Sequence, residues 1–241
     1  MNTARILEIE RREGRRRVDL RRARNQKTRR APLRGGATRV RFAPDDVDNI
    51  RAFYRTHGIV CVGNGLTART RRIIRSQSRR LTPTHDVREK TRRTVALRRS
   101  HRVSRAVYAD TRLRRVFHAL HGYALRPTTL PVEYRQYPSD SSGMAWHKDL
   151  LLTQPRQVEM VYTVHNHNRN TRLVWKTRGK KKMELRPRAG DVVFVLPNRT
   201  EHKVTSMRGG GGTRAILKFI AHPRGARKLK RFAEEKKEAF L

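Results

Sequence analysis

The chain has 241 residues, 36% of them hydrophobic, which allows one domain with a real core, with or without a tail, and excludes a wholly disordered protein. Its 59 lysines and arginines outnumber 20 acidic residues, so the net charge of +39 favours a polyanionic partner: nucleic acid, an anionic membrane face or an acidic protein. The single Cys61 excludes an internal disulfide, and neither a secretory signal nor the roughly 20 apolar residues of a spanning helix is found, so we expect a soluble intracellular protein.

Residues 1–40 are basic and contain few large apolar side chains. Their arginine runs at 15–17, 21–22 and 29–30 repel one another, and the segment cannot bury enough surface to fold alone. We interpret it as a disordered arm that either binds a polyanion, RNA or DNA, or is only a solvated tail. Binding by this arm would agree with a nuclear, ribonucleoprotein or particle association.

The pattern of a folded domain begins after this arm, and we place the domain at residues 41–223. Pro44 and two following aspartates are typical of a helix start, and apolar residues then recur at helical spacing. The expected segments of this helical part, 44–130, are a first helix that ends at Gly58, a buried strand at 59–62, a very basic helix at 66–81 and further helical cover over 82–130.

After Pro131 the pattern changes to short segments separated by turn residues, which is typical of an antiparallel sandwich or barrel. The predicted strands are 131–137, 144–151, 157–164, 171–177, 182–187, 191–196, 202–207 and 213–220. The predicted fold is mainly β with helical cover: a double-stranded β-helix, or jelly roll, whose core spans 131–223 and which N-terminal helices precede. Residues 224–241 predict a basic C-terminal helix or tail.

The clearest chemical pattern lies in His147, Asp149 and His202. His147 and Asp149 are separated by one residue, so on a strand both side chains emerge on the same face. Two imidazoles and one carboxylate on one face of a metal form the facial triad of non-haem Fe(II) oxygenases, which leaves positions open for substrate and oxygen. Either histidine alone would more often be a hydrogen-bonded structural residue, so the interpretation depends on its neighbours.

Arg214 strengthens this interpretation, because it lies on the next predicted strand, 213–220, which follows His202 and a run of four glycines. A buried arginine there can hold one end of a dicarboxylate through a bidentate pair of charge-assisted hydrogen bonds. The chain thus supplies three metal ligands and then a carboxylate clamp.

At these residues the chain resembles the Fe(II)- and 2-oxoglutarate-dependent dioxygenases, in particular their prolyl-hydroxylase-like branch. Residues 137–149 (YPSDSSGMAWHKD) are similar to the tyrosine and His-x-Asp of that branch. Residues 190–194 (GDVVF) and 201–204 (EHKV) resemble its strand and distal histidine, and 213–219 (TRAILKF) resembles its closing strand. The resemblance covers residues 131–223, with weaker support from 44–66.

The resemblance implies that His147, Asp149 and His202 ligate Fe(II). It implies that Arg214 binds the distal carboxylate of 2-oxoglutarate and that Tyr137 hydrogen-bonds the same end. The cosubstrate would be decarboxylated to succinate while a substrate C–H bond is hydroxylated, with ascorbate as an accessory reductant. No catalytic residue is expected beyond the iron ligands, because the cofactor carries the hard chemistry.

Two aromatic residues are candidates for the pocket wall. Trp146 adjoins a ligand but faces away from the iron by strand alternation, so core packing competes with a role as a substrate platform. Tyr162 lies on the following strand and either lines the pocket or fills the barrel. His165 and His167 have metal-ligand spacing but lie in a polar turn, which we interpret as a solvated loop, and we expect Cys61, in an apolar strand, to be inert.

Three functions agree with these features: hydroxylation of a protein side chain of the prolyl type, oxidative demethylation or hydroxylation of a nucleic-acid base, and a catalytically idle basic protein that binds nucleic acid or builds a particle. The net charge favours the function on nucleic acid. The stretch from Tyr137 to His147, which includes Trp146, also resembles AlkB-like repair enzymes. However, Arg135 stands where those enzymes usually carry asparagine, and residues 215–220 lack their second arginine. We favour the first, because only 6% of residues are aromatic and a flipped base needs stacking platforms.

Overall fold

The computed structural model describes residues 40–86, 91–177 and 179–238, so the predicted arm lies outside the described residues except for Val40. The helices are α2 (Val47–His57), α3 (Ala68–Ser78), α4 (Arg102–Ala109), α5 (Thr111–His121) and α6 (Lys230–Glu238). The strands are β1 (Arg41–Phe42), β2 (Ile59–Val62), β3 (Thr84–His85), β4 (Arg93–Leu97), β5 (Val132–Tyr137), β6 (Met144–His147), β7 (Thr153–Gln154), β8 (Val158–Asn166), β9 (Leu173–Lys176), β10 (Lys182–Leu185), β11 (Val192–Val195), β12 (His202–Val204), β13 (Arg214–Ala221) and β14 (Arg227–Lys228). Among these helices none is both long and apolar enough to cross a membrane.

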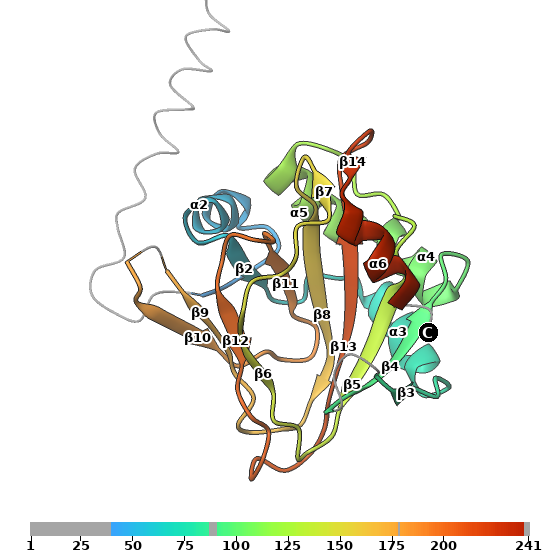
Figure 1. Cartoon of the computed structure of the whole chain (residues 1–241), viewed down its shortest axis with the longest axis vertical. Helices are drawn as coiled ribbons and strands as arrows, with labels where there is room; N and C mark the ends of the chain where they lie inside the picture. Colours follow the sequence, from blue (N-terminus) through green and yellow to red (C-terminus); the bar gives the residue numbers. More distant parts are fainter. Residues whose placement is uncertain (1–39, 87–90, 178, 239–241) are drawn as a thin grey trace, which may run out of the picture. The chain divides into compact units, whose positions relative to one another are not determined.

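Two sheets face each other (Figure 1). The major sheet has the order β1-β2-β11-β8-β13-β5-β4-β3, and the minor sheet has the order β10-β9-β12-β6. A short third pair joins β14 to β7. This arrangement confirms the predicted jelly roll with helical cover, and each of the eight strands predicted after Pro131 has a counterpart.

The segment 82–130 differs from its prediction, because it contributes strands as well as helices. β4 pairs with β5 and β3 pairs with β4, which extends the major sheet at one edge. Thr94 and Val95 are β-branched and suit an extended strand. The arginines around them weaken the apolar signal by which a strand is recognised. The short strands β1, β7 and β14 were also not predicted.

Capping residues mark where several of the covering helices begin or end. α2 ends at Gly58, which takes the left-handed conformation. α3 begins after Thr67, whose hydroxyl accepts a hydrogen bond from the amide of Thr70. α5 begins after Asp110, whose carboxylate accepts from the Leu113 amide and also from the Thr67 hydroxyl at 2.6 Å. Asp110 therefore joins the starts of α3 and α5.

The central strands of the major sheet are buried on both faces, and alternate residues contribute to two separate cores. One core lies between the sheet and helices α2 to α5, and its sheet residues include Val60, Val132, Met160, Tyr162, Phe194, Leu217 and Phe219. A second core lies between the two sheets and contains Ile59, Cys61, Leu173, Trp175, Leu185, Val193 and Val195. The inner face of β8, β13 and β5 is completed by polar and charged residues, and that is where the cavity lies.

The two sheets bring residues that are distant in the chain into register. In the minor sheet His147 at the end of β6 is the direct partner of His202 at the start of β12. In the major sheet Tyr137 at the end of β5 is the direct partner of Arg214 at the start of β13. Gly143 precedes β6 and lies so close to the loop after β12 that no side chain fits there.

We predict that Gly143→Ala destabilises the chain more than Gly122→Ala, although both glycines have positive φ values of 79° and 75°. An alanine held in the left-handed backbone conformation lowers the free energy of unfolding by about 1–2 kcal/mol at either position. A Cβ at 143 would also lie 2.4 Å from the Val204 carbonyl oxygen, whereas a Cβ at 122 meets no atom within 4 Å. Urea denaturation measures both free energies of unfolding. Equal losses would contradict the close approach of β6 and β12.

Candidate metal centre

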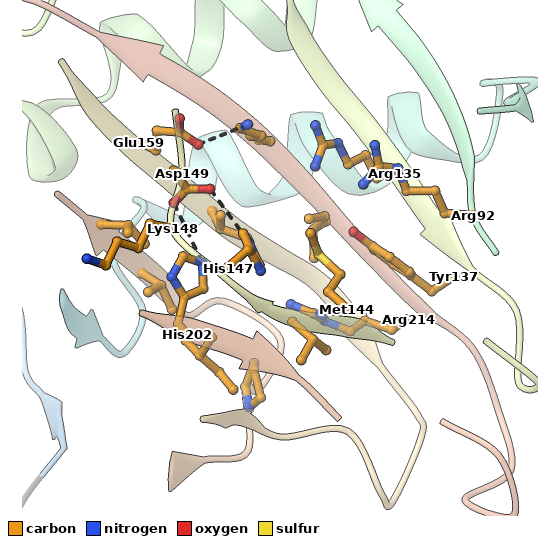
Figure 2. A pocket seen from close by; sticks show the side chains of 18 of the residues that line it. Arg92, Arg135, Tyr137, Met144, His147, Lys148, Asp149, Glu159, His202 and Arg214 are labelled. Carbon is orange, nitrogen blue, oxygen red and sulfur yellow. Dashed lines mark ion pairs between the residues drawn. The ribbon is translucent and has the colours of Figure 1, made fainter. Parts of the chain in front are cut away.

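Three candidate ligands converge in a cavity between the two sheets (Figure 2). His147 and His202 are cross-strand partners whose ring centroids are 4.3 Å apart. Asp149 follows β6 in a loop, and its carbonyl oxygen accepts a hydrogen bond of 2.9 Å from the amide of Asn198. The carboxylate of Asp149 lies 3.8 Å from Nε2 of His147 and 3.6 Å from Nε2 of His202. One ligand atom from each residue lies within 4.8 Å of the others.

The hydrogen bonds of the two imidazoles orient them as ligands. Nδ1 of His147 contacts the Ala145 carbonyl oxygen at 2.8 Å, and Nδ1 of His202 contacts the Thr200 carbonyl oxygen at 3.0 Å. Because a carbonyl oxygen only accepts, each Nδ1 carries the proton and each Nε2 offers its lone pair. The gaps between Nε2 and Asp149 are too long for hydrogen bonds. They suit donors that surround one metal ion at about 2.0–2.2 Å each.

Burial supports the same protonation state. It lowers the pKa of His202, an effect that nearby Asp149 opposes and nearby His147 reinforces, and the net result lies below the usual histidine value. His202 is therefore neutral near pH 7, as a metal ligand must be. Two neutral imidazoles and one carboxylate are the donor set that a non-haem Fe(II) site uses, so these residues fit the metal.

Opposite the metal ligands, the major sheet presents a buried guanidinium without a counter-ion. Arg214 is 5% exposed, its Nε has no hydrogen-bond partner, and within the described residues it forms no ion pair. The ring of Tyr137, its cross-strand partner, lies with its centroid 5.5 Å from the guanidinium carbon. Burial lowers the pKa of Arg214, although Tyr137 partly opposes this. A buried charge of this kind is costly unless it is paired, so the site fits an anionic group of a ligand.

The hydroxyl of Tyr137 lies in a strongly positive environment. Complete burial raises its pKa, but Arg135, Arg92 and Arg214 together outweigh burial and bring the pKa below the usual tyrosine value. The phenol is therefore a better hydrogen-bond donor than an ordinary tyrosine. Figure 2 shows Arg92, Arg135 and Tyr137 on the side of the cavity away from the histidines.

The other buried cations of the cavity are paired, in contrast to Arg214. Arg135 donates to Glu133 at 2.7 Å from its Nε. Nζ of Lys218 lies 2.9 Å from the carboxylate of Glu159. Burial raises the pKa of Glu159 to about 7, and Asp149 adds to this while Lys218 opposes it.

Sequence reasoning missed these paired charges, although a signal for them exists. Glu133, Arg135 and Tyr137 occupy alternate positions of β5, and Arg214 and Lys218 share one face of β13. Charged residues at the inward positions of otherwise apolar strands therefore mark the wall of a polar cavity.

The cavity has a volume of about 250 Å³ and is lined by both sheets. It brings together His147, Asp149, His202, Arg214 and Tyr137, the five residues to which the sequence analysis assigned ligand and cosubstrate roles.

The two aromatic candidates for the pocket wall, Trp146 and Tyr162, do not line this cavity. Tyr162 points to the other face of β8 and packs in the core beneath the helices. Trp146 is half-buried on the outside of the minor sheet, where Lys176 and Lys203 place their Nζ atoms 4.6 and 5.1 Å from its ring centroid. Strand alternation predicted the orientation of Trp146, but for Tyr162 it left both faces open.

The remaining residues singled out in the sequence do not join the site. His165 and His167 stack with centroids 4.9 Å apart and make no three-residue metal group with other described side chains. His165 instead contacts the Thr213 hydroxyl at 3.2 Å. Cys61 is 1% exposed in β2, and burial raises the pKa of its thiol well above the usual range.

Comparisons with known proteins agree on the fold. No family model and no curated protein matches the sequence. The solved epimerase SnoN of nogalamycin biosynthesis, described as non-haem and α-ketoglutarate dependent, matches with a TM-score of 0.62 and 16% identity over 76% of this chain and 83% of that one. A prolyl-4-hydroxylase of Pseudomonas putida matches with a TM-score of 0.55 and 15% identity over 73% and 99%.

A third solved structure has ligands in its site. HygX from Streptomyces hygroscopicus, with nickel, 2-oxoglutarate and hygromycin B bound, matches with a TM-score of 0.56 and 13% identity over 73% of this chain and 87% of that one. The chain therefore has the fold of the Fe(II)/2-oxoglutarate oxygenases, to which the sequence analysis had likened it.

We predict that His202→Ala and Asp149→Ala each weaken Fe(II) binding by more than the roughly 10- to 100-fold that loss of an outer-shell partner costs, because each removes a ligand. Anaerobic calorimetric titration with Fe(II) measures the affinity. The matched control is His165→Ala, which removes a half-buried imidazole from outside the cavity and should leave the affinity unchanged. A similar loss in the control, or none in the ligand variants, would contradict the assignment.

Proposed function

We propose that the chain is an Fe(II)- and 2-oxoglutarate-dependent dioxygenase that hydroxylates a C–H bond of a protein side chain, of the prolyl type. The observation that carries this proposal is a single cavity with two complementary walls. One wall holds the three metal ligands, and the other holds the unpaired guanidinium of Arg214. A molecule that spans them must have a metal-chelating end and an anionic end, which describes 2-oxoglutarate.

In this proposal His147, Asp149 and His202 hold Fe(II) and leave its other coordination positions open. Arg214 pairs with the distal carboxylate of 2-oxoglutarate, and the hydroxyl of Tyr137 donates to the same end. When bound, Fe(II) and 2-oxoglutarate supply the oxidation of a C–H bond by O₂, with decarboxylation of the cosubstrate to succinate. The residues of the chain bind and orient these groups and keep water from them.

The composition of the cavity supports a protein substrate over a nucleic-acid base. Among the described lining residues, Tyr137 is the one aromatic side chain apart from the two histidine ligands, and it lies at the Arg214 end. Aromatic side chains on which a flipped base could stack are therefore scarce in this cavity. Leu150 also lines the cavity and is 44% exposed, so it offers a peptide an apolar contact at the rim. The likeness to the Pseudomonas putida prolyl-4-hydroxylase supports the same choice.

The proposal also includes a polyanion, RNA or DNA, as the partner of the arm at residues 1–40, and a nuclear, ribonucleoprotein or particle association. These parts are supported by the charge of the sequence alone.

We predict that Arg214→Met weakens binding of 2-oxoglutarate about 10- to 100-fold and leaves Fe(II) binding intact, because a hydrogen bond to a charged group contributes about 1.5–3 kcal/mol. Anaerobic titration of the Fe(II)-loaded chain, followed by the visible charge-transfer band of the chelate, measures the affinity. Arg188→Met is the matched control, since it removes an exposed arginine whose side chain has no bonded partner within the described residues. Well-folded wild-type protein without such a band would contradict the proposed activity.

The substrate class is tested separately, by incubation of the active chain with proline-containing peptides and with methylated and unmethylated oligonucleotides. We expect succinate formation and a mass gain of one oxygen on a peptide. Oxygen insertion into, or demethylation of, the oligonucleotides alone would favour the base-modifying function instead.

A further inference from the structure

In their described residues, helices α3, α4 and α5 and their flanking turns carry exposed arginines and no exposed carboxylate. Within residues 66–86 and 91–130 the two acidic residues, Asp86 and Asp110, are only 6% and 3% exposed. Asp86 is held by Arg92 at 2.7 Å, and Asp110 caps α5. The exposed arginines of α3, α4, α5 and their flanking turns that lack a bonded partner in the described chain, here called the arginine face, are Arg69, Arg72, Arg75, Arg79, Arg80, Arg98, Arg99, Arg102, Arg105, Arg114 and Arg126.

The first half of the arginine face is a stripe along α3. Thr70 and Ile74 face the core, so the opposite side of the helix is left to solvent. Arg72, Arg75 and Arg79 follow one another at helical spacing on that side. The stripe from residue 69 to 79 is about 15 Å long, at 1.5 Å per residue. A shallow hollow on this side of the helix is lined by Arg72, Arg75, Ser76, Arg79 and Arg80.

The second half lies over the neighbouring helices. α4 packs against both α3 and α5, and Figure 1 shows α3 and α4 at the same side of the major sheet. An open hollow between α4 and the segment after α5 is lined by five arginines: Arg98, Arg99, Arg105, Arg114 and Arg126. Like charges gathered in this way repel one another, and an anion that lay along the face would offset this repulsion.

The residue types of the arginine face indicate which kind of anion it would bind. The cations of these helices and turns within the described residues are arginines, whose planar guanidinium groups match phosphate in a bidentate manner. No phenylalanine, tyrosine or tryptophan is exposed within residues 66–86 and 91–130, and stacking of bases on such side chains is how single strands are bound. The large apolar residue exposed in the described chain, Leu150, lies at the metal cavity, so the face has no anchor for a membrane.

We propose that the arginine face binds the phosphate backbone of a nucleic-acid double helix without reading its sequence. The face lies across the major sheet from the metal centre. On β8, Tyr162 and Val164 line the hollow beneath α3, whereas Glu159 and Val161 line the cavity that holds the metal ligands. A duplex bound there docks the protein and is not the molecule that is hydroxylated. The inference therefore stands independently of the proposed activity.

The experiment compares two full-length variants that lose the same charge. One carries Arg72→Gln, Arg75→Gln and Arg79→Gln on the stripe. The control carries Arg169→Gln, Arg188→Gln and Arg224→Gln, three exposed arginines elsewhere whose side chains have no bonded partner in the described part of the chain. Both keep residues 1–39, so the arm contributes equally. Binding to a fluorescent duplex of random sequence, as DNA and as RNA, is measured by anisotropy over a series of KCl concentrations.

We expect the stripe variant to lose about 10-fold or more in affinity near 0.15 M salt. The slope of log K against log [KCl] should fall by about 0.9 for each phosphate that the variant no longer neutralises. The control should stay near wild type. A third variant leaves the stripe intact and changes the other half of the arginine face, with Arg98→Gln, Arg99→Gln and Arg105→Gln. It should show a similar loss of affinity.

Equal losses in the stripe variant and the control would overturn the proposal, because net charge or the arm would then account for binding. So would preference for a single strand, or binding of anionic vesicles in place of duplexes. Unchanged thermal stability and an unchanged 2-oxoglutarate band show that each variant is folded. Wild-type affinity for the duplex in His147→Ala keeps this test separate from that of the oxygenase activity.

Discussion

A guanidinium buried without a counter-ion is the constraint on which this site depends. A buried unpaired charge costs several kcal/mol, and Arg214 is held nevertheless, because β13 lies inside the major sheet between β5 and β8. Pairing on both sides leaves the start of β13 no freedom to turn outward to water. The same register places Tyr137 beside the charge, and the minor sheet together with the loop after β6 places the candidate metal ligands opposite. Strand pairing therefore fixes the positive end of the cavity in place.

The parts of the site that the sequence could predict are those that follow from local geometry or from the family resemblance. His147 and Asp149 share a face because one residue separates them, and Arg214 lies on a predicted strand. The direct pairing of His147 with His202 depends on contacts between distant segments, which no local pattern encodes. The sequence could not show which face of β8 carries Tyr162. Because β8 is buried on both faces, apolar residues do not alternate with polar ones along it, and the pattern does not distinguish the two faces. β4 was missed since arginines obscure its apolar positions.

The major sheet separates the cavity between the sheets from the core beneath the helices. Adjacent residues of one strand face these two environments in turn. Along β8, Glu159 and Val161 face the metal cavity, while Met160 and Tyr162 pack beneath the helices. A change in one layer need not disturb the other, provided that the strand register is kept. This separation is the physical reason why chemistry in the cavity and charge on the helical surface can belong to one small domain. It also means that a slip of one residue in β8 would exchange the two sets of side chains.

Net charge explains little of the electrostatics in the cavity, although the chain carries +39 overall. Charges on the surface are surrounded by water and salt, which screen them within about 10 Å. Inside the cavity, the charge of a buried cation is offset by an adjacent carboxylate: that of Arg135 by Glu133, and that of Lys218 by Glu159. Arg214 is the exception, because no carboxylate of the described residues offsets its charge. At Tyr137 that charge adds to those of Arg135 and Arg92, whereas Asp149 and Lys218 act on His202 at the other end of the cavity. Removing many surface arginines should therefore alter binding of polyanions and leave the affinity for a small dicarboxylate almost unchanged.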